Sequence, residues 1–208
     1  MRAPQEAVFM TIDRSRFDQG LTYDAFKAQM TRNRERLEEN EKRVDLAKEN
    51  VAAFRALPRP VKVVVLAEDW CGDVIANLPV LGRLAQESGK LDVRIFLRDQ
   101  NDDIMQRYLN KGQFKSIPVF VFFDEDFREL GHWIERPASV TEIRAKRRKE
   151  IFAAHPEFGS PDAPVDALPE EVRVRLQSEL AKMREDTTKF ANAEVVRELR
   201  EIATRVAA

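Results

Sequence analysis

Cysteine and histidine, the residues that most often react or bind metals, are scarce in this chain of 208 residues. It has one cysteine, Cys71, and two histidines, His132 and His155. A single cysteine excludes an internal disulfide framework and a cysteine-rich zinc site. Neither histidine has a partner at a spacing that metal ligands use, and the glycines are not spaced as a phosphate-binding loop requires. We therefore expect no bound metal and no other cofactor.

The balance of charge and the lack of long apolar runs exclude further classes of protein. The 35 Lys and Arg residues against 36 Asp and Glu residues leave a formal net charge of −1, which gives no global argument for binding nucleic acid or an anionic membrane surface. No apolar run approaches the ~20 residues of a membrane-spanning helix, and the first residues do not resemble a signal peptide. A lone cysteine fits a reducing compartment. We expect a cytoplasmic protein that binds neither nucleic acid nor membrane.

Strand and helix patterns alternate between residues 61 and 136. The run from Val61 to Leu66 is rich in β-branched residues, which is typical of a buried strand. The helix pattern that follows contains Pro79, which should kink it, and ends at Gly89. The predicted order is β-α-β-α-β-β, with strands over 61–66, 91–97, 119–123 and 127–133, a helix over 73–88, and a short helix between Asn101 and Gly112.

Helical patterns flank this region on both sides. Residues 22–57 contain one apolar stripe without Gly or Pro, with Thr22 as a cap and Pro58 as a stop, and they predict one long helix. The stripe fits a helix that lies on its own domain or, alternatively, one that pairs with a second subunit in a homodimer formed by the terminal helices. Towards the C-terminus we expect a helix over 139–154, a proline-rich linker over 155–169, and a helical segment over 170–206 with a possible break near Thr187.

Cys71 lies between the first strand and the first helix, in the run Glu-Asp-Trp-Cys-Gly-Asp-Val. A helix N-terminus carries partial positive charge and unpaired N–H groups, which favour the nucleophilic thiolate. This position predicts a reactive thiol with a lowered pKa, whereas a lone cysteine elsewhere is usually a small buried apolar residue. Asp73 opposes the thiolate through its charge, and its simplest role is that of an acid in the first helical turn. A Cys-X-X-Cys pair would need a cysteine where the chain has Val74.

Two motifs together resemble the thioredoxin superfamily: Trp70-Cys71-Gly72-Asp73 at the start of a helix, and Ser116-Ile117-Pro118-Val119 before a later strand. The resemblance covers residues ~60–154. It implies an α/β fold with a thioredoxin-like mixed four-stranded sheet flanked by helices, and with helical N- and C-terminal extensions. The expected organisation is an N-terminal segment over 1–59, a thioredoxin-like domain over 60–154, a linker over 155–169 and a C-terminal helical extension over 170–208.

The resemblance also implies roles for individual residues. Cys71 matches the nucleophilic cysteine of the family, and Pro118 matches the cis-proline beside it. In such proteins the backbone of the residue before the proline pairs with a bound substrate chain, and an aromatic residue flanks the site. The expected substrate-binding residues are therefore Trp70, Gly72, Asp73, Ile117 and Pro118.

The chain departs from thioredoxins at two positions. Val74 replaces the second cysteine, and Val65 falls where thioredoxins carry a buried acid. The chain is similar to a thioredoxin-like group in which Trp-Cys-Gly-Asp is followed by a small or apolar residue. We expect thiol–disulfide oxidoreductase activity in which Cys71 forms a mixed disulfide with a protein or a low-molecular-weight disulfide, and an external thiol resolves it. The alternative is a non-catalytic binding module that keeps the fold, so the sequence leaves open whether the chain is an enzyme.

Overall fold

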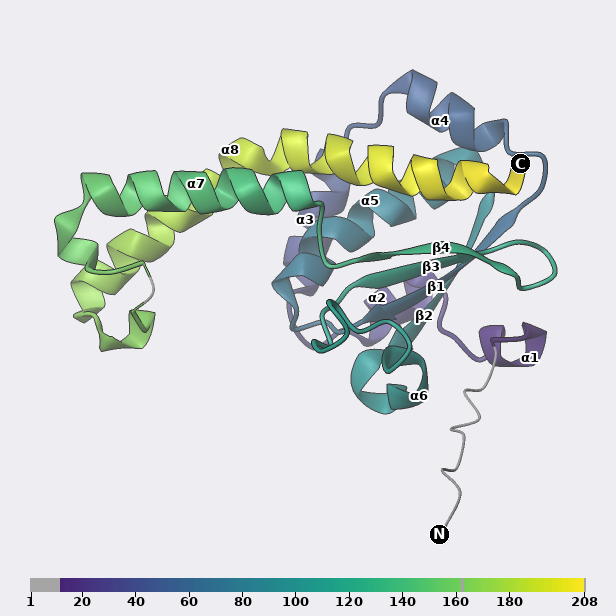
Figure 1. The fold of residues 1–208 in the computed structure, drawn as a ribbon, viewed down its shortest axis with the longest axis horizontal. Helices are drawn as coiled ribbons and strands as arrows, with labels where there is room; N and C mark the ends of the chain where they lie inside the picture. The colour runs from purple at the N-terminus through teal and green to yellow at the C-terminus, as the bar shows by residue number, and fades with distance from the viewer. Residues whose placement is uncertain (1–11, 162, 208) are drawn as a thin grey trace, which may run out of the picture. The chain divides into compact units, whose positions relative to one another are not determined.

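A mixed four-stranded sheet forms the centre of the computed structural model, which describes residues 12–161 and 163–207. Strands β1 (Val61–Ala67), β2 (Leu91–Leu97), β3 (Val119–Phe123) and β4 (Glu129–Ile134) lie in the order β2-β1-β3-β4 (Figure 1). β1 runs parallel to β2 and antiparallel to β3, and β3 runs antiparallel to β4. Every residue of β1 is buried, as a central strand requires. The predicted order of strands and helices in this region is confirmed.

The N-terminal helical segment differs from the prediction. Instead of one helix over 22–57, the chain forms α2 (Tyr23–Gln29), α3 (Arg34–Arg43) and α4 (Lys48–Arg55). Thr22 caps α2 as predicted, but Asn33 adopts a left-handed backbone with a φ of 55° just before α3, which ends any continuous helix. The apolar stripe is nevertheless buried within this chain, at Phe26, Leu37, Val44, Val51 and Phe54.

The helix after β1, α5 (Gly72–Ser88), is continuous although Pro79 lies inside it. Proline has no N–H group and so cannot donate to the carbonyl four residues earlier, which here belongs to Ile75. The side chain of Asn40, on α3, donates from its Nδ2 to that oxygen at 2.9 Å. A polar residue in the middle of the N-terminal stripe therefore supplies the hydrogen bond that the proline removes.

Short elements complete the edge of the sheet and its connections. They are α1 (Arg14–Phe17), η1 (Arg98–Gln100) and α6 (Asp102–Met105). Leu21 and Ile95 exchange two backbone hydrogen bonds of 2.8 Å, which partly covers the open edge of β2.

The chain divides into two compact units: one holds the residues up to Glu135 and the segment from Val196, and the other holds Arg136–Val195. In the second unit, α7 (Ala138–Ala154) and the first part of α8 (Glu170–Ala203) run side by side (Figure 1). The proline-rich segment between them contains the short helices η2 (Pro156–Phe158) and η3 (Val165–Ala167). The apolar cluster of this unit comprises Phe152, Phe158, Leu176, Leu180 and Met183.

The break predicted in α8 near Thr187 is wrong. The hydroxyl of Thr187 is hydrogen-bonded to the carbonyl of Met183, one turn earlier, at 3.0 Å. It also accepts a hydrogen bond from Nε of Arg144 on α7 at 3.2 Å. Because both bonds satisfy the hydroxyl inside a regular helix, the residue does not interrupt it.

The last turns of α8 and η4 (Thr204–Ala207) belong to the first unit and pack beside β4. Trp133 donates from Nε1 to the carboxylate of Glu198 at 2.7 Å, and its ring stacks on Phe120 with centroids 4.9 Å apart. Arg205 donates to the backbone oxygen of Leu130 at 3.2 Å. These contacts attach a segment that is distant in sequence to the outer strand of the sheet.

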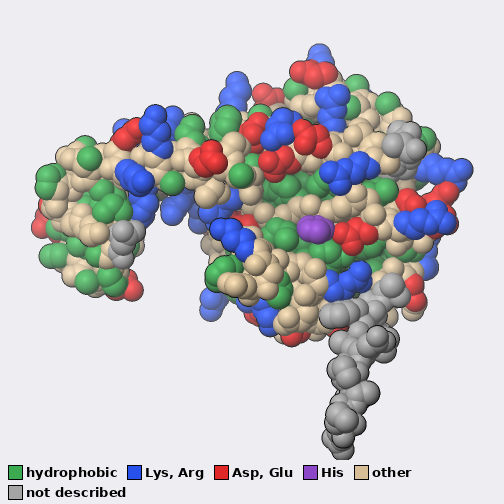
Figure 2. Space-filling view, in the orientation of Figure 1, with side chains coloured by type: hydrophobic (Ala, Val, Ile, Leu, Met, Phe, Trp, Pro, Cys, Tyr) green, Lys and Arg blue, Asp and Glu red, His purple; other side chains and the backbone are tan. Residues whose placement is uncertain are grey.

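The face of the molecule in Figure 2 carries charges of both signs, and no described helix could span a membrane. Basic and acidic side chains are interspersed over the face in Figure 2. Among the helices of residues 12–161 and 163–207, none combines the length and the apolar character that crossing a bilayer needs.

Replacing Asn40 by alanine should lower the free energy of unfolding by about 1–3 kcal/mol, because the buried carbonyl of Ile75 loses its donor. In a Pro79→Ala background the N–H of residue 79 can donate to the same oxygen, so the substitution should cost less there. Denaturant unfolding of the four proteins measures both values. An equal cost in the two backgrounds would contradict this role of Asn40.

Candidate functional site

Cys71 meets the loop before β3 at the N-terminus of α5. Its side chain is partly exposed, and its Sγ lies 3.4 Å from the backbone oxygen of Ile117, to which the thiol donates. The peptide bond between Ile117 and Pro118 is cis, and both residues are buried. The structure thus brings together the residues that carry the two sequence motifs, although they lie 46 positions apart in the chain.

Trp70 is the exposed aromatic residue of the site. Its side chain is 41 % exposed, and the guanidinium of Arg98 lies over its ring at 4.8 Å from the centroid, within the range of a cation–π contact. Arg98 also donates to the backbone oxygen of Lys115 at 3.2 Å, which links Trp70 to the loop before Pro118. Asp73 lies in the first turn of α5, in the position expected for an acid there.

The predicted lowering of the Cys71 pKa is wrong. Burial raises the pKa of this thiol, while the nearby backbone N–H groups of Val74 and Asp73 lower it. The negative charges of Asp73 and Glu135 raise the pKa further. The net shift is upward, because the donors of the helix N-terminus do not offset desolvation and two nearby carboxylates.

Asp69 connects the cysteine-bearing loop to the N-terminal helices. Its Oδ2 accepts hydrogen bonds from the backbone N–H groups of Thr31 at 2.7 Å and of Arg32 at 3.0 Å. In return, the side chain of Asn33 donates to the backbone oxygen of Asp69 at 2.9 Å. The chain between α2 and α3 therefore needs this loop to satisfy its backbone donors, and the same bonds hold the loop that carries Cys71.

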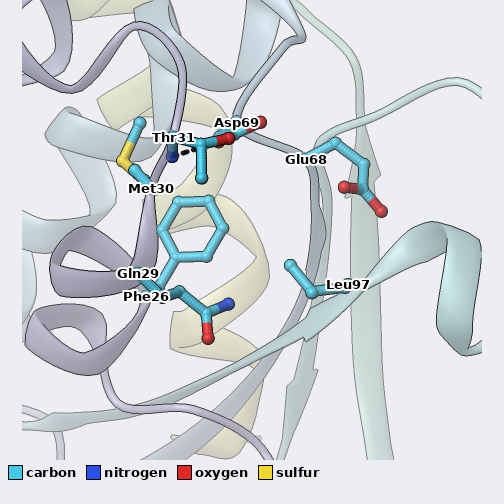
Figure 3. A pocket seen from close by; sticks show the side chains of 7 residues that line it. All are labelled: Phe26, Gln29, Met30, Thr31, Glu68, Asp69 and Leu97. Atoms are coloured by element: carbon cyan, nitrogen blue, oxygen red, sulfur yellow. Dashed lines mark hydrogen bonds between the residues drawn. The ribbon is translucent and has the colours of Figure 1, made fainter.

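A pocket of about 300 Å³ lies beside this loop. Figure 3 shows Glu68 and Leu97 on one side, Met30 on the other and the ring of Phe26 between them. Glu68 is a buried carboxyl that the sequence analysis missed. It accepts a hydrogen bond from the backbone of Asp99 at 2.8 Å, and burial raises its pKa. The only signal in the sequence was its position directly after a buried strand.

Glu135, directly after β4, is the second residue that the sequence analysis missed. Its backbone N–H donates to the oxygen of Pro118 at 2.8 Å, and its backbone oxygen accepts from Nδ2 of Asn77 at 3.0 Å. Its carboxylate accepts from Nδ2 of Asn110 at 2.9 Å. Its left-handed φ of 65° is uncommon for a residue other than glycine, and no pattern in the sequence predicted it.

The two histidines lie next to carboxylates of their own segments. Nδ1 of His132 is 2.9 Å from Oε1 of Glu129, and Nδ1 of His155 is 3.4 Å from Oε1 of Glu157. Within the described residues, no group of three His, Cys, Asp or Glu side chains is arranged to hold a metal ion.

A family model described as Thioredoxin matches residues 20–149, which is more than half of the sequence. The chain therefore belongs to the thioredoxin family. The predicted fold class, a mixed four-stranded sheet flanked by helices with a thioredoxin-like topology, is confirmed. Among curated proteins, no sequence matches this chain significantly.

Two solved structures share the fold. An HIV epitope-scaffold is 18 % identical with a TM-score of 0.60, and the match covers 89 % of this chain and 93 % of the scaffold. A protein of unknown function from Pseudomonas aeruginosa is 19 % identical with a TM-score of 0.58, and the match covers 85 % of this chain and 99 % of that protein. At this level of identity, the similarities describe the fold and not the activity.

Replacing Asp69 by alanine should lower the free energy of unfolding by about 1–3 kcal/mol, since two backbone donors lose a charged acceptor. Asp69→Asn keeps a side-chain oxygen and should lose less. Asp45→Ala removes an exposed aspartate between α3 and α4 and should change the stability by no more than about 0.5 kcal/mol. Denaturant unfolding compares the three variants, and a loss in Asp69→Ala no larger than in Asp45→Ala would count against the connection.

The alkylation rate of Cys71 by iodoacetamide should rise with pH along a curve whose midpoint lies above that of the denatured protein, because burial raises the pKa of the thiol. The folded state then keeps a proton that the unfolded state releases. The stability that Cys71 contributes is present below the unfolded pKa and is lost as the pH rises through the folded pKa. Intact mass measured against time gives the curve, and a midpoint at or below the denatured value would refute the shift.

Proposed function

We propose that this protein carries out thiol–disulfide exchange with the single thiol of Cys71. One observation carries the proposal: the Sγ of Cys71 lies 3.4 Å from the backbone oxygen of Ile117, beside the cis bond to Pro118. Membership of the thioredoxin family supports it, since the residues that match the reactive motifs of that family come together here. A substrate chain laid along Ile117 would place its disulfide next to the sulfur.

The reaction proceeds in two exchange steps. The Cys71 thiol first loses its proton to solvent, and the thiolate attacks one sulfur of the substrate disulfide. The substrate S–S bond breaks, a mixed disulfide forms at Cys71, and the departing thiolate takes up a proton. An external thiolate then attacks the substrate sulfur of the mixed disulfide, the bond to Cys71 breaks, and Cys71 leaves as a thiolate that takes up a proton. Position 74 is Val74, so no second cysteine of the chain can take this role.

The raised pKa of Cys71 sets the character of this chemistry. A smaller fraction of the sulfur is ionised at neutral pH, but each thiolate is more nucleophilic. Cys71 is also a poor leaving group, because a thiolate leaves more slowly as its pKa rises. The second step, in which an external thiolate attacks the substrate sulfur and expels Cys71, is therefore slow. The protein is suited to hold a thiol in a long-lived mixed disulfide.

Reduced protein treated with 2-hydroxyethyl disulfide should gain one adduct at Cys71, visible by intact mass, and Cys71→Ser should gain none. Corrected for the fraction of thiolate, the rate should exceed that of a peptide with the sequence of residues 66–76 by about tenfold or more, because the folded site orients the disulfide. Pro118→Ala should lose most of this advantage while the Cys71 thiol remains present.

The comparison with the peptide decides between the two functions that the sequence left open. A rate per thiolate equal to that of the peptide, in folded protein, would contradict exchange chemistry and favour a binding module. Thermal unfolding of Pro118→Ala must be measured alongside, so that loss of the fold is not mistaken for loss of positioning.

A further inference from the structure

Glu135 is fixed beside the cis-proline loop by three hydrogen bonds from different parts of the fold. Its backbone binds the oxygen of Pro118 and the side chain of Asn77 on α5, and its carboxylate binds Asn110. A left-handed conformation is unfavourable for a residue other than glycine, so these bonds hold Glu135 where the chain alone would not place it.

The position of Glu135 follows from the contacts of Pro118. The oxygen of Pro118 accepts the Glu135 N–H, and the preceding residue, Ile117, accepts the Cys71 thiol through its own oxygen. The backbone of Glu135 therefore lies beside the cis-proline loop, and its carboxylate is held by Asn110, in the segment that leads into that loop. Its negative charge reaches the sulfur, since it contributes to the raised pKa of Cys71.

Asp73 supplies a second negative charge, from α5. It lies two residues after Cys71 in the first turn of α5, and its charge also acts on the thiol. Two basic side chains on neighbouring loops are engaged in ion pairs. Arg98 is 2.6 Å from Asp99, and the exposed Lys115 is 2.5 Å from Asp102.

We propose that the substrate of this site is a disulfide that carries positive charge next to its reacting sulfur, and that Glu135 is the residue that selects it. This inference rests on the exchange reaction proposed above. A cationic group near Glu135 and Asp73 offsets their charge, so the Cys71 thiol loses its proton more readily when such a substrate is bound. An anionic disulfide adds a like charge and has the opposite effect.

The size of the selection follows from Coulomb's law. A unit charge about 6 Å from a carboxylate, with an effective dielectric constant between about 40 and 80, changes a rate by roughly three- to tenfold. Two substrates of opposite charge should therefore differ by about tenfold or more. Because the site is partly exposed, the difference should shrink as the salt concentration rises.

Three small symmetrical disulfides of similar length test the proposal: cationic cystamine, neutral 2-hydroxyethyl disulfide and anionic 3,3′-dithiodipropionate. The rate of adduct formation at Cys71 is measured by intact mass near neutral pH in low salt. Each rate is divided by that of the 66–76 peptide in which Glu68 is replaced by Gln and Asp69 and Asp73 by Asn, which removes the intrinsic reactivity of the disulfide without cancelling the effect of Asp73. The corrected rates should fall in the order cationic, neutral, anionic, with a ratio of about tenfold or more between the extremes.

Glu135→Gln keeps an oxygen that can accept from Asn110 and removes only the charge. It should reduce the ratio between cystamine and dithiodipropionate by about three- to tenfold. Asp73→Asn should reduce it in the same direction, which keeps the test open if Glu135→Gln does not fold. Glu125→Gln is the matched control: it removes a carboxylate at the turn between β3 and β4, at the far end of these strands, and should leave the ratio unchanged.

The outcomes separate this inference from the proposed function. If, per thiolate, all three disulfides react with Cys71 no faster than with the peptide, exchange chemistry fails, and charge selection fails with it. If adducts form faster than with the peptide but the corrected rates are equal, or if Glu135→Gln and Asp73→Asn keep the full ratio, exchange chemistry stands and the role of Glu135 is overturned.

Discussion

The loop that ends in Cys71 is held in place by hydrogen bonds from segments far apart in the sequence. Asp69 accepts the backbone donors of Thr31 and Arg32, and the Cys71 thiol reaches across to Ile117 on the other side. The N-terminal helices thus support the site as well as cover the sheet. Without these bonds the thiol would remain at a helix N-terminus, but its distance from the cis-proline loop would no longer be fixed. Exchange chemistry at this site requires that distance to be fixed.

The charge at the sulfur shows why position on a helix does not decide reactivity by itself. The backbone N–H groups of Asp73 and Val74 favour the thiolate, as the sequence argument assumed. Burial between α5 and the Ile117 loop acts in the opposite direction and dominates, and the Asp73 and Glu135 carboxylates add to it. A sequence motif predicts which backbone donors lie near a thiol. It does not predict how far the thiol is desolvated, because desolvation depends on segments that only the fold brings together.

Much of the sheet was predictable because its strands carry their own signal. β2 and β3 have the predicted bounds and β1 differs by a single residue, since β-branched and aromatic runs between turn residues are local features. The N-terminal segment failed for a related reason: three short helices that cover one domain share a stripe that a single helix would also show. What divides the first two is the left-handed Asn33 and the bonds to Asp69, and the chain leaves the helical conformation again at Val44 before α4; none of these features is visible without the fold. The roles of Glu68 and Glu135 could not be predicted either, because they depend on contacts with segments that are distant in the sequence.

The raised pKa of Cys71 and the proposed preference for cationic disulfides have one electrostatic origin. The carboxylates that hinder ionisation of the free thiol are the groups that a positive charge on the substrate would meet. A thiol of this kind is largely protonated while the site is empty, and its ionisation is coupled to the arrival of a matching substrate. The same two carboxylates act on the ionisation of the free thiol and on the choice of substrate. A variant that makes the free thiol more acidic should therefore also discriminate less between cationic and anionic disulfides. That coupling would distinguish this site from one in which a helix N-terminus alone activates the sulfur.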